Sequence, residues 1–214
     1  MKNSNRIENF LEKLNRFTDL PLTVKSRFLI LIAIVSLMMT YAFPLYRMTL
    51  NSNFYPEGLV LNIYSYKLES GDHGRHLKEI NVLNHYIGMK HIQESDFPEL
   101  TWLPLAIGII SLLALRLLIM GRMSGLIDLV VLLSYLAGFS FYRFYVWLYN
   151  YGHDLSPQAA MKIEGFTPPL IGFRQIANFG VTNMPRSGAV FLGIAAALLV
   201  AAIFFSRKQK ISEE

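Results

Sequence analysis

The chain has 214 residues, of which 53% are hydrophobic and only 16% are charged, so it is too apolar to be an ordinary soluble domain of this size. Its basic residues, which give a net charge of +5, lie mostly at the ends of apolar blocks; this pattern is typical of membrane topology, and we expect no nucleic-acid partner. The sequence contains no cysteine, which excludes disulfides, thiolate metal sites and a catalytic thiol.

Residues 1–27 form a polar and amphipathic segment that we expect on the cytoplasmic side. One helical face of this segment is apolar, at Ile7, Phe10, Leu11, Leu14 and Phe17. The pattern predicts a helix that lies in the interface of the cytoplasmic leaflet. The segment is longer than the basic start of a usual signal peptide, so we expect the apolar block that follows it to remain as a membrane anchor.

Four apolar blocks come close to the roughly 20 residues that a helix needs to cross a bilayer. They are residues 28–46, 100–120, 126–148 and 188–206. In the last block small residues recur every four positions, at Ala189, Gly193, Ala197 and Ala201. Such a stripe allows close helix packing, either within the protein or in a helix–helix oligomer. The blocks predict an all-α membrane protein with about four transmembrane helices.

Lys and Arg residues near the four blocks predict the orientation. If there are four spans, three basic groups fall on one side: Lys2, Arg6, Lys13, Arg16, Lys25 and Arg27; then Arg116 and Arg122; then Arg207, Lys208 and Lys210. Both termini, including the tail at 207–214, are then cytoplasmic in a multi-pass protein of the bacterial inner membrane. The loops at 47–99 and 149–187 lie outside.

Three charged residues fall within the expected spans. Arg116 and Asp128 flank the tight turn between the second and third spans, so they lie at similar depth and are expected to pair. Arg143 lies near the outer end of the third span, from which its side chain can reach the headgroups. We therefore expect structural roles for these charges rather than a transport pathway.

Both outer loops are expected to be ordered. In the first, residues 58–67 predict a short strand, residues 70–72 a turn, and residues 75–92 a helix. The second loop is rich in proline and glycine, but its segment at 166–179 is apolar and aromatic. This composition predicts an irregular loop that packs on the first loop or forms a docking surface.

All five histidines lie in the two outer loops: His73, His76, His85, His91 and His153. On a helix, Asn81, His85 and Met89 would share one face. Imidazole and thioether groups without thiolates are a ligand set suited to copper. The candidate metal ligands are therefore His85, Met89, His91 and His153. The alternative for each histidine is a structural group hydrogen-bonded within its loop.

Motifs of catalysis are missing from the sequence, which has no P-loop, no nucleophile elbow, no HExxH and no dinucleotide-binding glycine pattern. We therefore assign no catalytic residues and do not expect an enzyme. An enzyme of the membrane interface would have His85 and Asp154 as its obvious acid–base pair, but nothing in the sequence places them together.

Two segments carry a family resemblance: EINVLNHYIGMKHI at 79–92, and FTPPLIGFRQIANF at 166–179, which HDLSP at 153–157 precedes. They resemble a family of bacterial membrane proteins encoded beside nitrous-oxide reductase genes, some of them near the copper-chaperone lipoprotein of that system. The resemblance covers about a third of the chain. On the matching positions, the residues whose chemistry suits copper are Asn84, His85, Met89, His91 and His153.

The resemblance implies a non-enzymatic accessory protein of the inner membrane. Its periplasmic face would support the maturation of a periplasmic copper enzyme such as nitrous-oxide reductase, or supply it with copper or electrons. The expected partner is a periplasmic copper protein or chaperone, beside the lipid bilayer itself. The alternative function is a small transporter or a transporter subunit, which would need a central polar pathway that the spans lack.

Overall fold

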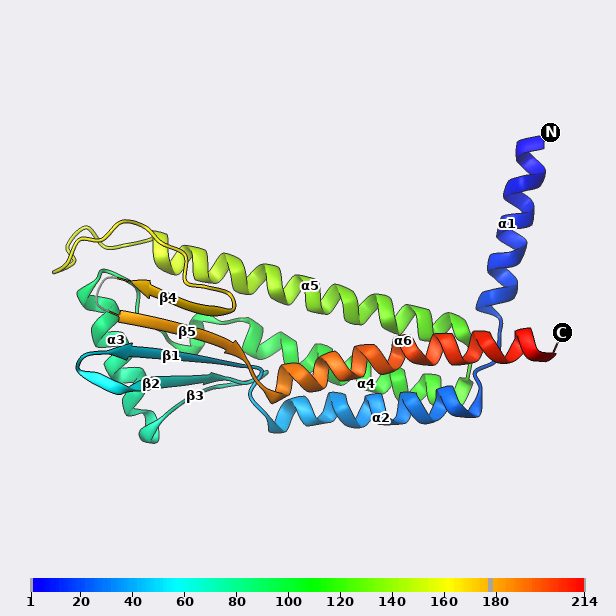
Figure 1. Ribbon diagram of the computed structural model, residues 1–214, viewed down its shortest axis with the longest axis horizontal. Coiled ribbons are helices and arrows are strands. Elements are labelled where there is room, and N and C mark those ends of the chain that lie inside the picture. Colours follow the sequence, from blue (N-terminus) through cyan, green and yellow to red (C-terminus); the bar gives the residue numbers. More distant parts are fainter. Residues whose placement is uncertain (1, 177–178, 214) are drawn as a thin grey trace. The chain divides into compact units, whose positions relative to one another are not determined.

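The computed structural model describes residues 2–176 and 179–213 (Figure 1); the side chains of residues 2–7, 9, 10 and 208–213 lie outside this description. The chain divides into two compact units. The helical unit comprises Met1–Met38, Ile107–Leu136 and Leu192–Glu214, and the sheet unit comprises Met39–Ala106 and Ala137–Phe191.

The described helices include four that are long and apolar enough to span a membrane. They are α2 (Val24–Ala42), α4 (Glu99–Met120), α5 (Met123–His153) and α6 (Ser187–Glu213). Only 22% to 33% of each apolar window is buried within the chain. Most of the apolar surface on these helices therefore needs a hydrophobic solvent, which a bilayer provides. Helix α2 begins and ends four residues earlier than the block at 28–46 predicted. Its end at Ala42 precedes Pro44, which cannot continue a helix.

Close packing inside the helical unit combines apolar side chains with one buried hydroxyl cluster. Ile30, Ile107 and Leu199 are fully buried. The Ser206 hydroxyl donates to Ser26 Oγ at 2.7 Å, and Ser26 Oγ donates to the Ala202 carbonyl at 2.8 Å. These bonds tie α2 to α6 and leave the buried hydroxyls satisfied.

Helix α1 (Lys2–Thr18) covers most of the expected amphipathic segment. Leu11 and Leu14 are 49% and 45% exposed, so this apolar face is not covered by the rest of the chain. The side chains of Ile7 and Phe10, which complete the predicted face, lie outside the described residues. The same holds for Lys208 in the tail.

A five-stranded antiparallel sheet forms the centre of the sheet unit, so the prediction of an all-α fold is wrong. Its order is β3-β2-β1-β5-β4, with β1 (Tyr46–Ser52), β2 (Tyr55–Ile63), β3 (Leu68–Ser70), β4 (Gly172–Ile176) and β5 (Phe179–Pro185). Figure 1 shows β1 beside β5, and the register places Met48 opposite Asn183. The two expected outer loops thus share one sheet.

Two sequence predictions about this sheet need correction. The first loop contributes three strands rather than the single strand expected at 58–67, and β1 crosses the predicted boundary between the first apolar block and the loop. The expected irregular loop at 149–187 begins with the last turns of α5 and ends with the β4–β5 hairpin. In β5, Phe179, Val181 and Asn183 are buried in alternation, which is the period of a strand.

Helix α3 (Arg75–Tyr86) packs on β2 and is shorter than the helix predicted at 75–92. Gly88 ends it with a φ of +84°. The amide of Gly88 donates to the His85 carbonyl at 3.1 Å, and the amide of Met89 donates to the Asn84 carbonyl at 2.8 Å. This pair of bonds is the Schellman motif, in which glycine takes the left-handed position after the last helical turn. Short 3₁₀ turns precede and follow this region at Asp72–Gly74 and Glu94–Asp96.

The charges within the predicted spans do not all behave as expected. No ion pair joins Arg116 to Asp128 in the described part of the chain, and Arg116 Nε instead donates to Met120 Sδ at 3.4 Å. Arg143 forms an ion pair with Glu99 at 2.7 Å, so it links the start of α4 to α5. The expected Arg116–Asp128 pair is therefore wrong, and Arg143 has a partner within the protein.

The small-residue stripe of α6 faces away from the rest of the chain at its centre. Gly193 and Ala197 are exposed, and a Cβ atom built on Gly193 would meet nothing within 4 Å. Close packing of Gly193 and Ala197 within the protein is therefore not observed among the described residues. Packing of the stripe against a partner helix stays a prediction.

Candidate metal and docking site

The first segment that carries the family resemblance, at 79–92, contacts residues 154–161, which lie just before the second segment at 166–179. The Ser156 amide donates to the Gly88 carbonyl at 2.8 Å, and the Met161 amide donates to the Tyr86 carbonyl at 3.0 Å. An ion pair joins Lys90 to Asp154. The turn after α3 and the segment after α5 therefore form one joined surface.

Glycine is required at the centre of this joint. A Cβ atom built on Gly88 would lie 2.8 Å from the Cβ of Ala159 and 3.0 Å from the carbonyl oxygen of Ser156. Both distances are shorter than ordinary van der Waals contact, and the positive φ of Gly88 is itself unfavourable for other residues. Gly88 in the sequence NHYIGM therefore ends α3 and also lets its backbone lie close to residues 156–159.

Side-chain amides and a phenol fix the segment that follows the turn. Asn81 donates through Nδ2 to the Ile92 carbonyl at 3.1 Å, and its Oδ1 accepts from the Ile92 amide at 2.7 Å. The Tyr151 hydroxyl donates to the His91 carbonyl at 2.9 Å. Asn81, which the sequence placed on a candidate ligand face, therefore has a structural role.

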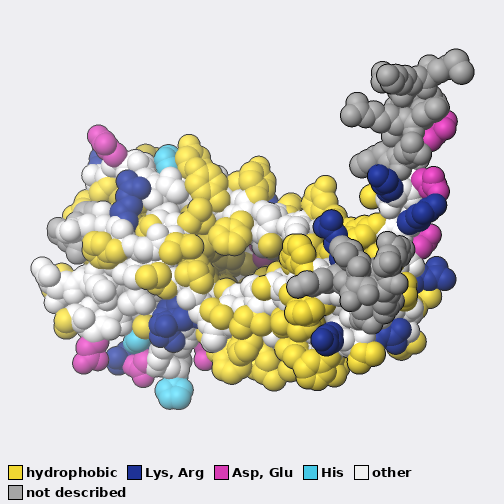
Figure 2. Space-filling model, turned by 45° about the vertical axis from the view of Figure 1, so that its right-hand side comes forward, with side chains coloured by type: hydrophobic (Ala, Val, Ile, Leu, Met, Phe, Trp, Pro, Cys, Tyr) yellow, Lys and Arg dark blue, Asp and Glu magenta, His cyan; other side chains and the backbone are white. Residues whose placement is uncertain are grey.

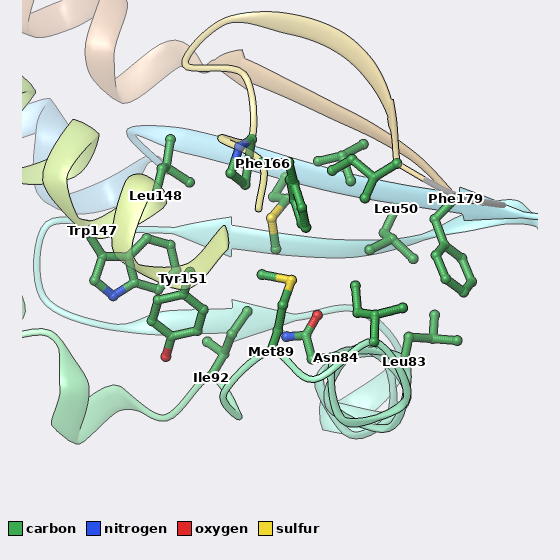
Figure 3. A pocket seen from close by; sticks show the side chains of 15 residues that line it. Leu50, Leu83, Asn84, Met89, Ile92, Trp147, Leu148, Tyr151, Phe166 and Phe179 are labelled. Atoms are coloured by element: carbon green, nitrogen blue, oxygen red, sulfur yellow. The ribbon is translucent and has the colours of Figure 1, made fainter. Parts of the chain in front are cut away.

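His85 is exposed, whereas Met89 is partly buried against the core of the sheet unit. Together with Asn84 it points into an apolar cavity of about 40 Å³, which Tyr151 and Phe166 also line (Figure 3). The cavity has room for a few water molecules and is too small for a substrate. Because α3 ends before Met89, the helical spacing that joined His85 to Met89 in the sequence does not exist in the structure.

Two of the four predicted metal ligands do lie together. The rings of His85 and His91 meet edge to face, with centroids 5.9 Å apart and an interplanar angle of 88°. Both residues are exposed, and neither ring has a hydrogen-bond partner within the described ranges. Free nitrogens on both rings are the donors that a metal ion requires.

The fourth predicted ligand, His153, is held by other contacts. Its Nδ1 lies 2.9 Å from the Tyr149 carbonyl, and its ring stacks on the Tyr149 ring with centroids 3.9 Å apart. His153 precedes Asp154, which pairs with Lys90, so it belongs to the same joined surface. Across the residues described, no three or more His, Cys, Asp and Glu side chains are grouped to hold a metal ion. The arrangement thus offers a pair of imidazoles rather than a multidentate cage.

A groove of about 550 Å³ opens beside His85, within the size range of ligand-binding pockets. Its walls come from the β1–β2 turn, the exposed side of α3, the segment at 158–161 and Phe179 of β5. Three large side chains at this groove are exposed: Phe54 by 85%, Val82 by 62% and Tyr86 by 48%. The residues that line it carry no Lys, Arg, Asp or Glu, so the groove suits an uncharged, largely apolar ligand or peptide segment.

Sequence reasoning missed this groove because four separate segments build it. The one readable signal was Phe54, an aromatic residue in the tight turn between two strands, where polar residues are usual. Together with the exposed Val82 and Tyr86, this aromatic side chain forms an apolar patch, which is typical of a contact surface.

Two further hydrogen bonds join polar groups within the sheet unit. The Tyr55 hydroxyl donates to Glu79 Oε2 at 2.6 Å, which ties β2 to α3 and raises the pKa of Tyr55. His76 Nδ1 accepts a hydrogen bond from the Val60 amide at 3.0 Å, so this nitrogen is not free to bind a metal ion. Burial raises the pKa of Tyr46 at the start of β1, so its phenol stays neutral.

Comparison with known protein families gives no matching family model, and comparison with curated proteins gives no match either.

Proposed function

We propose that the chain is a non-enzymatic accessory protein of the bacterial inner membrane, whose sheet unit lies on the periplasmic side. There the groove docks a copper-handling partner, and His85 and His91 exchange Cu(I) with it. The resemblance of residues 79–92 and 166–179 to proteins encoded beside nitrous-oxide reductase genes supports maturation of, or copper supply to, that reductase as the purpose.

The observation that carries the proposal is that His85 belongs both to the histidine pair and to the groove. Its ring faces His91, and the same residue lines the groove. A metal ion held by these two imidazoles would lie at the edge of a docked partner, where it could be passed on. Neutral imidazole is a good copper ligand, and Cu(I) accepts two nitrogen donors in a linear arrangement. Such a low coordination number suits a site that binds and releases copper as cargo.

The distribution of charge supports the orientation. The basic residues Arg27, Arg122 and Arg207 all belong to the helical unit and lie at the ends of its spans. Lys and Arg near span ends are retained on the cytoplasmic side. Helices that each cross once then put the loops that build the sheet unit on the other side.

A small transporter has less support. In the helical unit, the buried hydroxyls of Ser26 and Ser206 form hydrogen bonds with each other and with a backbone carbonyl. They are therefore not free to line a transport pathway. We therefore keep the docking and copper role as the single proposed function.

Anaerobic titration of the purified full-length chain with Cu(I), buffered by a chromophoric chelator, tests the copper site. We expect one Cu(I) per chain and loss of competition with the chelator in His85→Ala and in His91→Ala. The matched control is His73→Asn, which removes another exposed histidine of the same unit at a left-handed position that asparagine tolerates. Equal binding by His85→Ala and the control, or no binding by the unmodified protein, would overturn the proposal.

A further inference from the structure

The end of the helical unit at which α4 is joined to α5 is rich in basic side chains. Arg27 and Arg122 are exposed there, as are Lys25, Arg116 and Arg207. Figure 2 shows Lys and Arg side chains gathered around this end. Ion pairs with a carboxylate are not found for any of these five residues in the described part of the chain. Like charges that gather without an ion-pair partner repel one another, and a bound anion would relieve this repulsion.

Backbone hydrogen bonds make the turn between α4 and α5 rigid. The Leu22 amide donates to the Gly121 carbonyl at 2.7 Å, and the Met123 amide donates to the Leu20 carbonyl at 2.9 Å. A β-bridge between Pro21 and Arg122 joins the same two segments. The chain that enters α2 is thereby fixed to the turn that carries Arg122.

Gly121 places the Arg27 guanidinium directly beside this turn. A Cβ atom built on Gly121 would lie only 2.3 Å from Arg27 Nη2 and 3.0 Å from Cζ. Gly121 also has a φ of +65° and closes the end of α4. The side chain of Arg27 thus lies over residue 121, next to Arg122 in sequence. The fold therefore holds the Arg27 guanidinium beside the turn that carries Arg122.

We propose that Arg27 and Arg122 form a headgroup site for an anionic phospholipid. Arg27 lies in the first turn of α2, and Arg122 lies between α4 and α5, so both are at the ends of membrane-spanning helices, where lipid phosphates lie. A guanidinium donates two parallel hydrogen bonds to a phosphate, which a lysine cannot do. The lipid site is independent of the copper site, because all its residues lie in the helical unit.

Lipid retention by the full-length chain, measured by native mass spectrometry from nanodiscs, tests the site. With phosphatidylglycerol and phosphatidylcholine offered together, we expect the unmodified protein to retain phosphatidylglycerol. Arg27→Gln and Arg122→Gln should each reduce this retention about tenfold, as expected when a pair of charge-assisted hydrogen bonds is lost. Arg27→Lys keeps the charge and should lose part of the retention, which separates the fork geometry from charge and guards against a folding defect.

Arg116→Gln is the matched control, because it removes the same charge at the same end of the unit but not at the turn. If the site is formed by Arg27 and Arg122, Arg116→Gln should retain phosphatidylglycerol almost as well as the unmodified protein. Equal losses in Arg116→Gln and Arg27→Gln would mean a diffuse basic surface and would overturn the proposal. Equal retention of the two lipids would overturn it as well, and so would displacement of phosphatidylglycerol by inorganic phosphate at equal concentration, which would identify a free-anion site.

Discussion

Replacing Gly88 by alanine tests the joint between the two segments that form the candidate site. The left-handed backbone of residue 88 costs an alanine about 1 kcal/mol. The new Cβ would also lie 2.8 Å from Ala159 and 3.0 Å from the Ser156 carbonyl, so the segment at 156–159 must move. That movement stretches the bond from the Ser156 amide to the Gly88 carbonyl, at a further cost of roughly 1 kcal/mol or more.

The expected total is about 2–3 kcal/mol, which corresponds to a fall in melting temperature of roughly 4–12 °C for a chain of this size. Gly74→Ala is the matched control. Gly74 has a φ of +95°, but a Cβ atom there would meet nothing within 4 Å, so only the backbone cost of about 1 kcal/mol applies. Thermal unfolding of the purified protein can be followed by tryptophan fluorescence, since Trp147 packs against Phe97 and Tyr151 in the sheet unit. Equal shifts for the two variants would refute the close approach at Gly88.

Three further predictions concern the sheet unit. The hydrogen bond from Tyr55 to Glu79 raises the pKa of Tyr55, so this bond stabilises the fold at neutral pH and is lost as the pH rises through the folded-state pKa. The unmodified protein should therefore melt at a higher temperature than Tyr55→Phe at neutral pH. This difference in melting temperature should vanish well above the ordinary tyrosine pKa of 10.0. Glu99→Gln and Arg143→Gln should each lower the melting temperature, because each breaks the ion pair. A double-mutant cycle should give a coupling energy of at most about 1 kcal/mol, since the pair is partly exposed. A coupling energy of zero would mean that the ion pair does not stabilise the fold. Val181→Ile adds one methylene to the lining of the cavity of about 40 Å³ and should raise stability by up to about 0.8 kcal/mol, whereas a lower melting temperature would show that the cavity cannot accept it.

The four long helices could be predicted because a run of about 20 apolar residues is long enough to cross a bilayer and has too few polar groups for a helix that faces water. The sheet could not, because its central pair joins β1 to β5, which lie far apart in the sequence. The residues of β1 follow an apolar block without a polar break, so hydropathy alone assigns the start of the strand to the end of a span. In β5 a buried asparagine, Asn183, interrupts the apolar alternation, and only the fold supplies its partner, the Pro169 carbonyl at 2.7 Å.

The candidate site was predicted in part for a similar reason. The residue types near His85 and the location of the histidines outside the four apolar blocks were readable, but the helical spacing was extended through Gly88. A glycine at that point both ends α3 and allows close approach of Ser156, and the resulting turn places Met89 against the core. His91 meets His85 only because the chain reverses after Gly88, which no periodic pattern records.

Both the copper proposal and the docking groove depend on the sheet unit lying outside the cytoplasmic membrane. The absence of cysteine makes a direct measurement possible, since a single introduced thiol will be the only one in the protein. Phe54→Cys places a thiol at the groove, where the native side chain is 85% exposed, and Asp19→Cys places one at an exposed position before α2. Spheroplasts of a bacterial host that produce either variant are treated with a membrane-impermeant maleimide. We expect labelling of Phe54→Cys in intact spheroplasts and labelling of Asp19→Cys only after lysis; the opposite pattern would contradict the proposed orientation and the periplasmic site with it.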